Sequence, residues 1–432
     1  MPQTGGPIPA RHVAAVVVGN ALEFYDFLTY AFFAVYIGRA FFPSSDPTSS
    51  LLASLGTFGV GFVTRPIGGF VIGRMGDRLG RKPAMVLSFT LMGVAIVGLA
   101  VTPSYATIGI AAPALVILFR MVQGFALGGE VGPTTAFLLE AAPIERRGFY
   151  TAFQTWTQDV AVLSSGLVGF TLANLLNAQQ LEEYGWRIAF LVGAAIVPFG
   201  VIMRRNLPET DHKGGKGTAE KAPLVAIAVL GLLLLASATI STYVRTYMTT
   251  YAIATLHMRA NVAFAATVVV GLCGLVFDLP AGAISDRIGR RPVMLIPSLV
   301  LLGLIFPVFH LILHYRSTAA LLGGVALMST LATIATCPVV IWVAESFPAP
   351  IRSGGVGIVY AVAIAVFGGT TQAGVTWLIR ATGSPMAPAW YWLVSLIVGL
   401  IAIMAAHESA PRKSAKRTAA ESIAVQIPDQ AG

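Results

Sequence analysis

Long apolar runs separated by short polar segments extend along almost the whole chain. Twelve of these runs are long enough for a membrane-spanning helix, which needs about 20 residues. Lipid offers no partners to backbone polar groups, so such runs form helices. The predicted spans are residues 13–37, 51–73, 84–101, 111–138, 149–176, 186–203, 223–253, 262–283, 293–313, 319–344, 354–379 and 389–406. The pattern predicts an all-α membrane protein with twelve transmembrane helices.

The predicted spans fall into two sets of six. The segment between the sixth and seventh spans is polar and rich in charge and glycine, as expected of a linker. We therefore predict an N-terminal six-helix bundle over 1–203, a cytoplasmic linker over 204–222, a C-terminal six-helix bundle over 223–407 and a cytoplasmic tail over 408–432.

Composition supports this class of protein. Of the 432 residues, 56% are hydrophobic and 11% are charged, whereas soluble domains carry about 25% charged residues. That composition excludes a water-soluble surface. The net charge of +9 does not indicate binding to nucleic acid, because the basic residues are divided among many short loops.

The basic residues also indicate the orientation in the membrane. If both termini are cytoplasmic, most lysines and arginines lie in cytoplasmic loops, as the positive-inside rule requires. The opposite side then receives only Arg39, Arg187, Arg259, Arg316 and Arg380. No cleavage site follows the first apolar run, which argues against a removable signal peptide. We expect the basic tail to bind anionic lipid and to be otherwise disordered.

Two loops repeat the same polar pattern. Asp77 and Arg78 after the second span correspond to Asp286 and Arg287 after the eighth, each pair followed by glycine and arginine. A second correspondence, an acid followed by proline and arginine, comes after the fourth and tenth spans. The chain therefore consists of two related halves. The residues concerned are Gly73, Asp77, Arg78, Gly80, Arg81, Glu140, Arg147, Asp286, Arg287, Arg290, Glu345 and Arg352.

We interpret these loop residues as a cytoplasmic gate. We expect their acids and arginines to bridge helix ends, with Arg147 beside Glu140 and Arg352 beside Glu345, and to separate when the halves rock. Bridges of this kind would stabilise an outward-open state. In the alternative, the arginines only determine topology, but that role does not require the repeated aspartates and glycines.

These loops resemble those of the major facilitator superfamily, over almost the whole chain. The segments around Gly19 to Phe27, Arg65 to Gly68 and Arg120 to Gly132 resemble the metabolite:proton symporter family, and shorter pieces such as Gly148 to Thr151 resemble its citrate and 2-oxoglutarate carriers. The resemblance implies a monomer in the bacterial cell inner membrane, with two pseudo-symmetric six-helix bundles. It also implies transport of a small metabolite together with protons.

Ionisable residues inside predicted spans are candidates for proton coupling, because each costs at least about 2.5 kcal/mol to insert. Asp26 of the first span and Arg120 of the fourth both reach about mid-membrane. The resemblance implies the same two positions as coupling elements. Our hypothesis is that Asp26 takes the proton and Arg120 tunes it; a static ion pair is the alternative. Glu23 and Glu130 are either a second proton site or helix caps.

Arg245 in the seventh span is the candidate for binding an anionic substrate, since a guanidinium offers paired donors to a carboxylate. We expect Tyr243 and Tyr247 to share its helix face. In the alternative, Arg245 pairs with Asp159 or reaches the outer surface. Further polar candidates for substrate contact are Asp159, Gln154, Gln158, Gln123, Tyr25 and Gln372.

The sequence predicts a secondary transporter and not an enzyme, since it lacks a phosphate-binding loop, a nucleophile elbow and a zinc-protease motif. We expect no cofactor and no metal, because His310 and His314 have no accompanying acid or cysteine pattern. We predict proton symport of a small organic anion such as citrate or 2-oxoglutarate. The alternatives are symport of shikimate, an aromatic acid, proline or betaine, export by proton antiport, and a nutrient-sensing receptor without net flux.

Overall fold

The computed structural model describes residues 21, 24–25, 27–79, 81–128, 131–205 and 223–410. Within these ranges only the backbone is described at 73, 76–79, 81–82, 84–85, 141, 196–197 and 199–205. Glu23, Asp26, Gly80 and Glu130 lie outside the described residues, so their predicted roles stay predictions.

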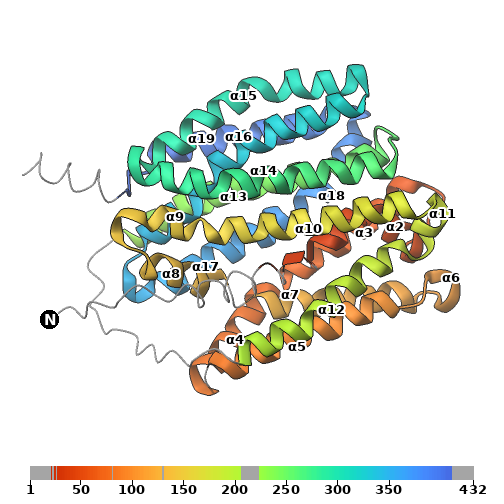
Figure 1. Cartoon of the computed structure of the whole chain (residues 1–432), viewed down its shortest axis with the longest axis horizontal. Coiled ribbons are helices and arrows are strands. Elements are labelled where there is room, and N and C mark those ends of the chain that lie inside the picture. Colours follow the sequence, from red (N-terminus) through yellow and green to blue (C-terminus); the bar gives the residue numbers. More distant parts are fainter. Residues whose placement is uncertain are drawn as a thin grey trace, which may run out of the picture.

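Helices make up nearly all of the described chain (Figure 1). In the first half these are α2 (Ala34–Phe41), α3 (Pro47–Val63), α4 (Arg65–Leu79), α5 (Arg81–Val101), α6 (Tyr105–Ile108), α7 (Ala111–Leu127), α8 (Val131–Ala141), η1 (Ile144–Arg146), α9 (Arg147–Thr151), α10 (Phe153–Leu175), α11 (Ala178–Gln180), η2 (Leu181–Gly185) and α12 (Trp186–Arg205). The second half holds α13 (Leu224–Ala254), α14 (Ala260–Ile288), α15 (Arg290–Tyr315), α16 (Thr318–Ser346), η3 (Ala349–Ile351), α17 (Arg352–Ala363), η4 (Ile364–Gly368), α18 (Gly369–Thr382) and α19 (Ala387–Ala405).

The helices follow the predicted spans, and several spans consist of two helices. The second span is α3 and α4, the fourth α7 and α8, the fifth α9 and α10, and the eleventh α17, η4 and α18. In the described residues eight helical segments are long and apolar enough to cross a membrane. α10 is not among them, because Gln154, Gln158 and Asp159 lower its apolar content.

The beginning of α3 shows how the sequence sets a helix boundary. Asp46 accepts hydrogen bonds from the Thr48 N–H at 3.1 Å and from the Ser49 N–H at 3.2 Å. Pro47 occupies the first helical position, where its missing N–H has no partner to lose. The side-chain cap satisfies donors that the helix itself leaves unpaired.

The two halves lie side by side. Figure 1 shows α4, α5, α7 and α12 of the first half below, and α13 to α16 and α19 of the second half above. α10 packs along α14, α3 against α18, and α8 against α17. Small residues allow these approaches: a Cβ at Gly59 would lie 2.6 Å from the Gly369 carbonyl oxygen, and one at Gly132 2.4 Å from that of Ser353. The halves are therefore in backbone contact.

Polar contacts join the halves at both ends of the bundle. At the end where α15 begins, the left of Figure 1, Arg352 pairs with Glu140 at 2.9 Å. We call this the Arg290 end, after the first residue of α15. At the opposite end Arg380 Nη2 lies 3.0 Å from Asp46 Oδ2. The two halves are therefore bridged by an ion pair at each end.

Close packing of α7 on α3 makes Gly124 sensitive to substitution. A Cβ at Gly124 would lie 1.5 Å from the Gly61 carbonyl oxygen, so Gly124→Ala forces the helices apart. Overpacking of this kind costs about 1–3 kcal/mol. We expect a lower unfolding temperature for the purified variant. Gly56→Ala on α3 is the matched control, because nothing lies within 4 Å of its added Cβ. Equal effects of the two substitutions would contradict the packing argument.

Candidate functional site

Arg120 of α7 is completely buried in the first half. Its Nη1 donates to Gln123 Oε1 at 2.6 Å. Its guanidinium carbon lies 4.3 Å from the ring centroid of Phe27, 4.5 Å from that of Tyr30 and 5.1 Å from that of Phe58. Aromatic faces favour a desolvated cation, so the pocket is built to hold positive charge. The predicted partner of Arg120, Asp26, lies outside the described residues.

Arg65 is a second buried arginine beside the same aromatic residues, and it is absent from our candidate residues. It begins α4 and is 4% exposed. Its guanidinium carbon lies 4.4 Å from the Phe27 centroid and 4.5 Å from the Phe62 centroid. The sequence signal was present, because Arg65 is a charged residue inside the predicted span 51–73.

Arg245 lies inside the second half, and within the described residues its hydrogen-bond partners are hydroxyl groups. It is 4% exposed, and its Nη1 donates to Thr333 Oγ1 at 2.8 Å while Nη2 donates to Thr242 Oγ1 at 3.3 Å. Its Nε has no hydrogen-bond partner within the described chain. No ion pair with Asp159 forms, and the side chain does not reach the surface, so the structure realises neither alternative role.

The expectation that Tyr243 and Tyr247 share the face of Arg245 is wrong. Tyr243 packs edge-on against Phe58 of α3, with centroids 6.0 Å apart, and the Tyr247 hydroxyl lies 2.8 Å from that of Thr376 on α18. Arg245 instead reaches Thr333 on α16. The reason is helix geometry: residues two positions apart are about 200° apart around the axis.

Polar side chains of α10 and α18 are buried or half-buried near the contact between halves. Gln154 is 1% exposed, and neither its amide nitrogen nor its oxygen has a partner in the described residues. Gln158 donates to the Tyr360 hydroxyl of α17 at 3.2 Å. Gln372 donates to Thr246 at 3.3 Å, and its oxygen is without a partner in the same described part. These amides keep hydrogen-bonding capacity for a ligand.

The Tyr25 hydroxyl, a predicted substrate contact, forms a hydrogen bond within the protein. It donates to the Ala189 carbonyl of α12 at 3.1 Å, which joins the first span to the sixth. A hydroxyl engaged in this way is less suited to a substrate than the prediction assumed.

Asp159 of α10 faces α14 of the other half. A Cβ added at Gly274 of α14 would lie 2.0 Å from Asp159 Oδ2. Only glycine at position 274 therefore leaves room for the carboxyl group. The group that it meets there is the carboxyl of Asp278, also on α14. Asp278 was not among the predicted site residues, although an acid inside the eighth span was a usable signal.

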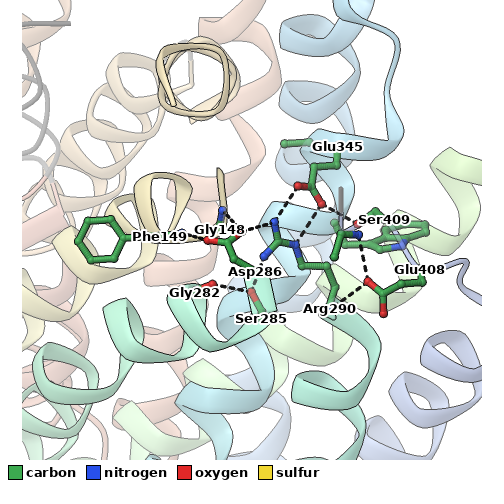
Figure 2. A network of polar contacts seen from close by, with 12 residues as sticks. Gly148, Phe149, Gly282, Ser285, Asp286, Arg290, Glu345, Glu408 and Ser409 are labelled. Atoms are coloured by element: carbon green, nitrogen blue, oxygen red, sulfur yellow. Dashed lines mark hydrogen bonds and ion pairs between the residues drawn. The ribbon is translucent and has the colours of Figure 1, made fainter. Parts of the chain in front are cut away.

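The repeated loop of the second half builds a polar network at the Arg290 end (Figure 2). Arg290 is fully buried and donates to Asp286 at 2.8 Å and to Glu345 at 2.8 and 3.1 Å. Asp286 also accepts the backbone N–H groups of Gly148 at 2.8 Å and Phe149 at 3.0 Å. Because these N–H groups belong to the first half, the network joins the two halves.

The acid and arginine partners differ from those predicted. Glu345 pairs with Arg290 and not with Arg352, while Arg352 crosses to Glu140 of the first half. Arg287 is exposed, and Arg147 has no ion pair within the described residues. Partners exchange because helix packing, not order in the sequence, decides which loops meet. For Gly73, Asp77, Arg78 and Arg81 only the backbone in α4 and α5 is described.

The first residues of the predicted tail belong to the same network, contrary to the expectation of disorder for 408–410. Glu408 accepts from the backbone N–H of Arg290 at 2.7 Å and of Arg291 at 3.2 Å, at the beginning of α15. Ser409 donates to Glu345 at 2.6 Å. A carboxylate at a helix N-terminus is favoured by the helix dipole. The remainder of the tail, 411–432, lies outside the described residues.

Comparison with known families agrees with this architecture. The model of the family described as "Sugar (and other) transporter" matches residues 12–222 and again residues 215–414. The chain belongs to this transporter family. Membership confirms the resemblance to the major facilitator superfamily and the predicted class of a transporter rather than an enzyme.

Individual relatives are similar over nearly their full length. The transporter is 34% identical to a citrate-proton symporter of Salmonella typhi, over 90% of this chain and 92% of the relative. It is 35% identical to the alpha-ketoglutarate permease of Escherichia coli (strain K12), over 92% and 94%. A proline/betaine transporter of Salmonella typhimurium is 30% identical, over 93% and 84%.

Solved structures share the fold at low sequence identity. A crystal structure of D-xylose-proton symporter matches with a TM-score of 0.71 at 19% identity, over 93% of this chain and 98% of that one. This confirms the predicted all-α fold of two six-helix bundles.

Proposed function

We propose that this transporter carries a small organic anion, a di- or tricarboxylate such as citrate or 2-oxoglutarate, together with protons. One observation supports this most: Arg245 keeps a buried guanidinium among neutral hydroxyls, with one N–H unused in the described residues. A buried cation without an ion-pair partner is costly. A substrate carboxylate would pair with the guanidinium directly and accept a hydrogen bond from the unused N–H.

The names of relatives support the same substrate class. Two of them, a citrate-proton symporter and an alpha-ketoglutarate permease, are named for carboxylates. The proline/betaine relative is less similar and keeps a zwitterion as the second candidate. Buried amides on α10 and α18, Gln154 and Gln372, have unused acceptors and donors that suit the hydroxyl or carbonyl groups of such substrates.

For proton coupling we propose Asp26 as the proton carrier and Arg120 as the group that tunes it, with Glu23 and Glu130 as a further pair. The described part of this proposal is the pocket of Arg120, where aromatic faces and Gln123 contact the buried guanidinium. A carboxyl group that enters this pocket would lose its proton, because the positive charge of Arg120 favours the ionised form.

We further propose that transport proceeds by alternating access, with residues 1–203 and 223–407 as the moving halves and 204–222 as the linker. The Arg290 end would be cytoplasmic, as the distribution of basic residues favours. Opening of that end would break the Asp286 contacts with Gly148 and Phe149 and the Arg352 pair with Glu140. We take the functional unit to be a monomer with both termini in the cytoplasm.

The experiment is uptake of labelled citrate, 2-oxoglutarate and betaine into liposomes that contain the purified chain, with and without an inward proton gradient. We expect the gradient to drive uptake of one of the two acids. Asp26→Asn is expected to abolish the effect of the gradient, and Asp46→Asn, at the exposed ion pair of the opposite end, is the control.

Each other result has a defined meaning. Uptake of betaine alone would overturn the carboxylate proposal. Uptake that increases with a proton gradient of the opposite sign would indicate antiport, and binding without uptake would indicate a receptor. An unchanged gradient response in Asp26→Asn would overturn the assignment of Asp26.

A further inference from the structure

Asp159 of α10 and Asp278 of α14 are two acids from different halves that meet inside the bundle. Asp159 Oδ2 would lie 2.0 Å from a Cβ at Gly274, one helical turn before Asp278, and the two carboxyl groups lie beside each other. Asp159 is 8% exposed and Asp278 is 2% exposed. α10 and α14 lie along each other over most of their length (Figure 1), so this contact lies on the main interface between the halves.

One oxygen of the Asp278 carboxyl group, Oδ2, lacks an N–H or hydroxyl donor in the described residues. The Thr155 hydroxyl lies beside this carboxyl group, but it donates to the Ala152 carbonyl at 3.0 Å. A buried acceptor without a donor is rare in folded proteins, which makes the neighbouring carboxyl group the available source of a hydrogen bond.

Two carboxylates in contact can form a hydrogen bond only if one of them carries a proton. With both ionised, two negative charges would repel each other in a medium where Coulomb energies are several-fold larger than in water. Pairs of carboxyl groups that share a site hold one proton between them for this reason.

The groups that face the pair can offset one negative charge. Arg245 of α13 attracts both carboxyl groups, and the thiols of Cys273 and Cys337 lie nearby on α14 and α16. One cation and one shared proton balance two acids. The same Arg245 is the proposed substrate-binding group, so a bound anion would compete with the acids for its charge.

We propose that Asp159 and Asp278 form a second proton site, shared between the halves, in which one proton bridges the two carboxyl groups while α10 and α14 are in contact. Loss of the proton to water would leave two like charges at the interface and favour separation of the helices there. Only an O–H bond breaks and forms. As a coupling element this inference rests on the proposed proton symport, but the proton itself can be tested without transport.

The test is infrared spectroscopy of the purified full chain in detergent without substrate, which detects protonated carboxyl groups directly. At neutral pH we expect a carboxylic-acid signal that decreases by about one group in Asp159→Asn and by the same amount in Asp278→Asn. The double variant is expected to lose no more than either single variant. Asp46→Asn, at the exposed ion pair of the opposite end, is the control and should keep this signal. Gel filtration confirms that each variant is folded.

The outcomes separate this inference from the proposed function. Loss of one signal in either single variant, and no further loss in the double variant, supports a shared proton. A signal that persists in Asp159→Asn or Asp278→Asn, or additive losses in the double variant, would overturn it. If the shared signal is present but no proton gradient drives uptake, the symport proposal fails and the proton site stands.

A second measurement connects the site to transport. In liposomes we expect Asp278→Asn to lower the number of protons that enter per citrate by about one, relative to wild type, while citrate uptake continues. An unchanged ratio together with the infrared result above would overturn the coupling role and leave a structural proton.

Discussion

Arg245→Gln is expected to lower uptake of citrate or 2-oxoglutarate by about 10- to 100-fold. Hydrogen bonds to a charged group contribute about 1.5–3 kcal/mol, and each 1.4 kcal/mol is about tenfold in binding. The guanidinium is 4% exposed and has no direct ion-pair partner in the described residues, so a substrate carboxylate would form its direct ion pair. The measurement is the concentration dependence of uptake in liposomes.

Two further variants make this result specific. Arg245→Lys keeps the charge but loses the paired donors, so we expect uptake between those of wild type and the glutamine variant. Arg259→Gln removes an exposed arginine at the N-cap of α14 and should leave uptake unchanged. Carboxylate uptake of Arg245→Gln equal to that of wild type would remove the main support for an anionic substrate.

Arg290→Met is expected to destabilise the transporter by about 3–5 kcal/mol, as removal of one partner from a buried ion pair does. Arg290 is 0% exposed, and its partners Asp286 and Glu345 have side chains 6% and 4% exposed. The substitution leaves both carboxylates buried beside an apolar side chain. Thermal unfolding of the purified chain measures the effect, which we expect as a clearly lower midpoint.

The neighbouring arginine provides a matched control. Arg287 is exposed, and surface substitutions change stability by about 0.5 kcal/mol or less, so Arg287→Met should unfold close to wild type. A triple variant that adds Asp286→Asn and Glu345→Gln to Arg290→Met removes the uncompensated charges. It should recover part of the lost stability. If Arg290→Met and Arg287→Met behave alike, the network does not stabilise the Arg290 end.

Several candidate residues could be selected from the sequence because their signal is local. A charge inside an apolar run is visible without any structure, and this identified Arg120, Arg245 and Asp159. The same signal was present for Arg65 and Asp278, which were not selected. The arrangement of Tyr243 and Tyr247 was predicted incorrectly because their spacing from Arg245 was not converted into an angle around the helix.

The sequence by itself determined the helices, the two related halves and the class of protein. A bilayer constrains each span separately, through its length and apolar content. The helices can therefore be predicted from consecutive residues. Only the tertiary structure decided the partners: Arg290 with Glu345, Arg352 with Glu140, and Asp159 with Asp278. Partners of this kind lie on different helices, and which helices touch depends on packing of the whole bundle, where close glycine contacts set the distances.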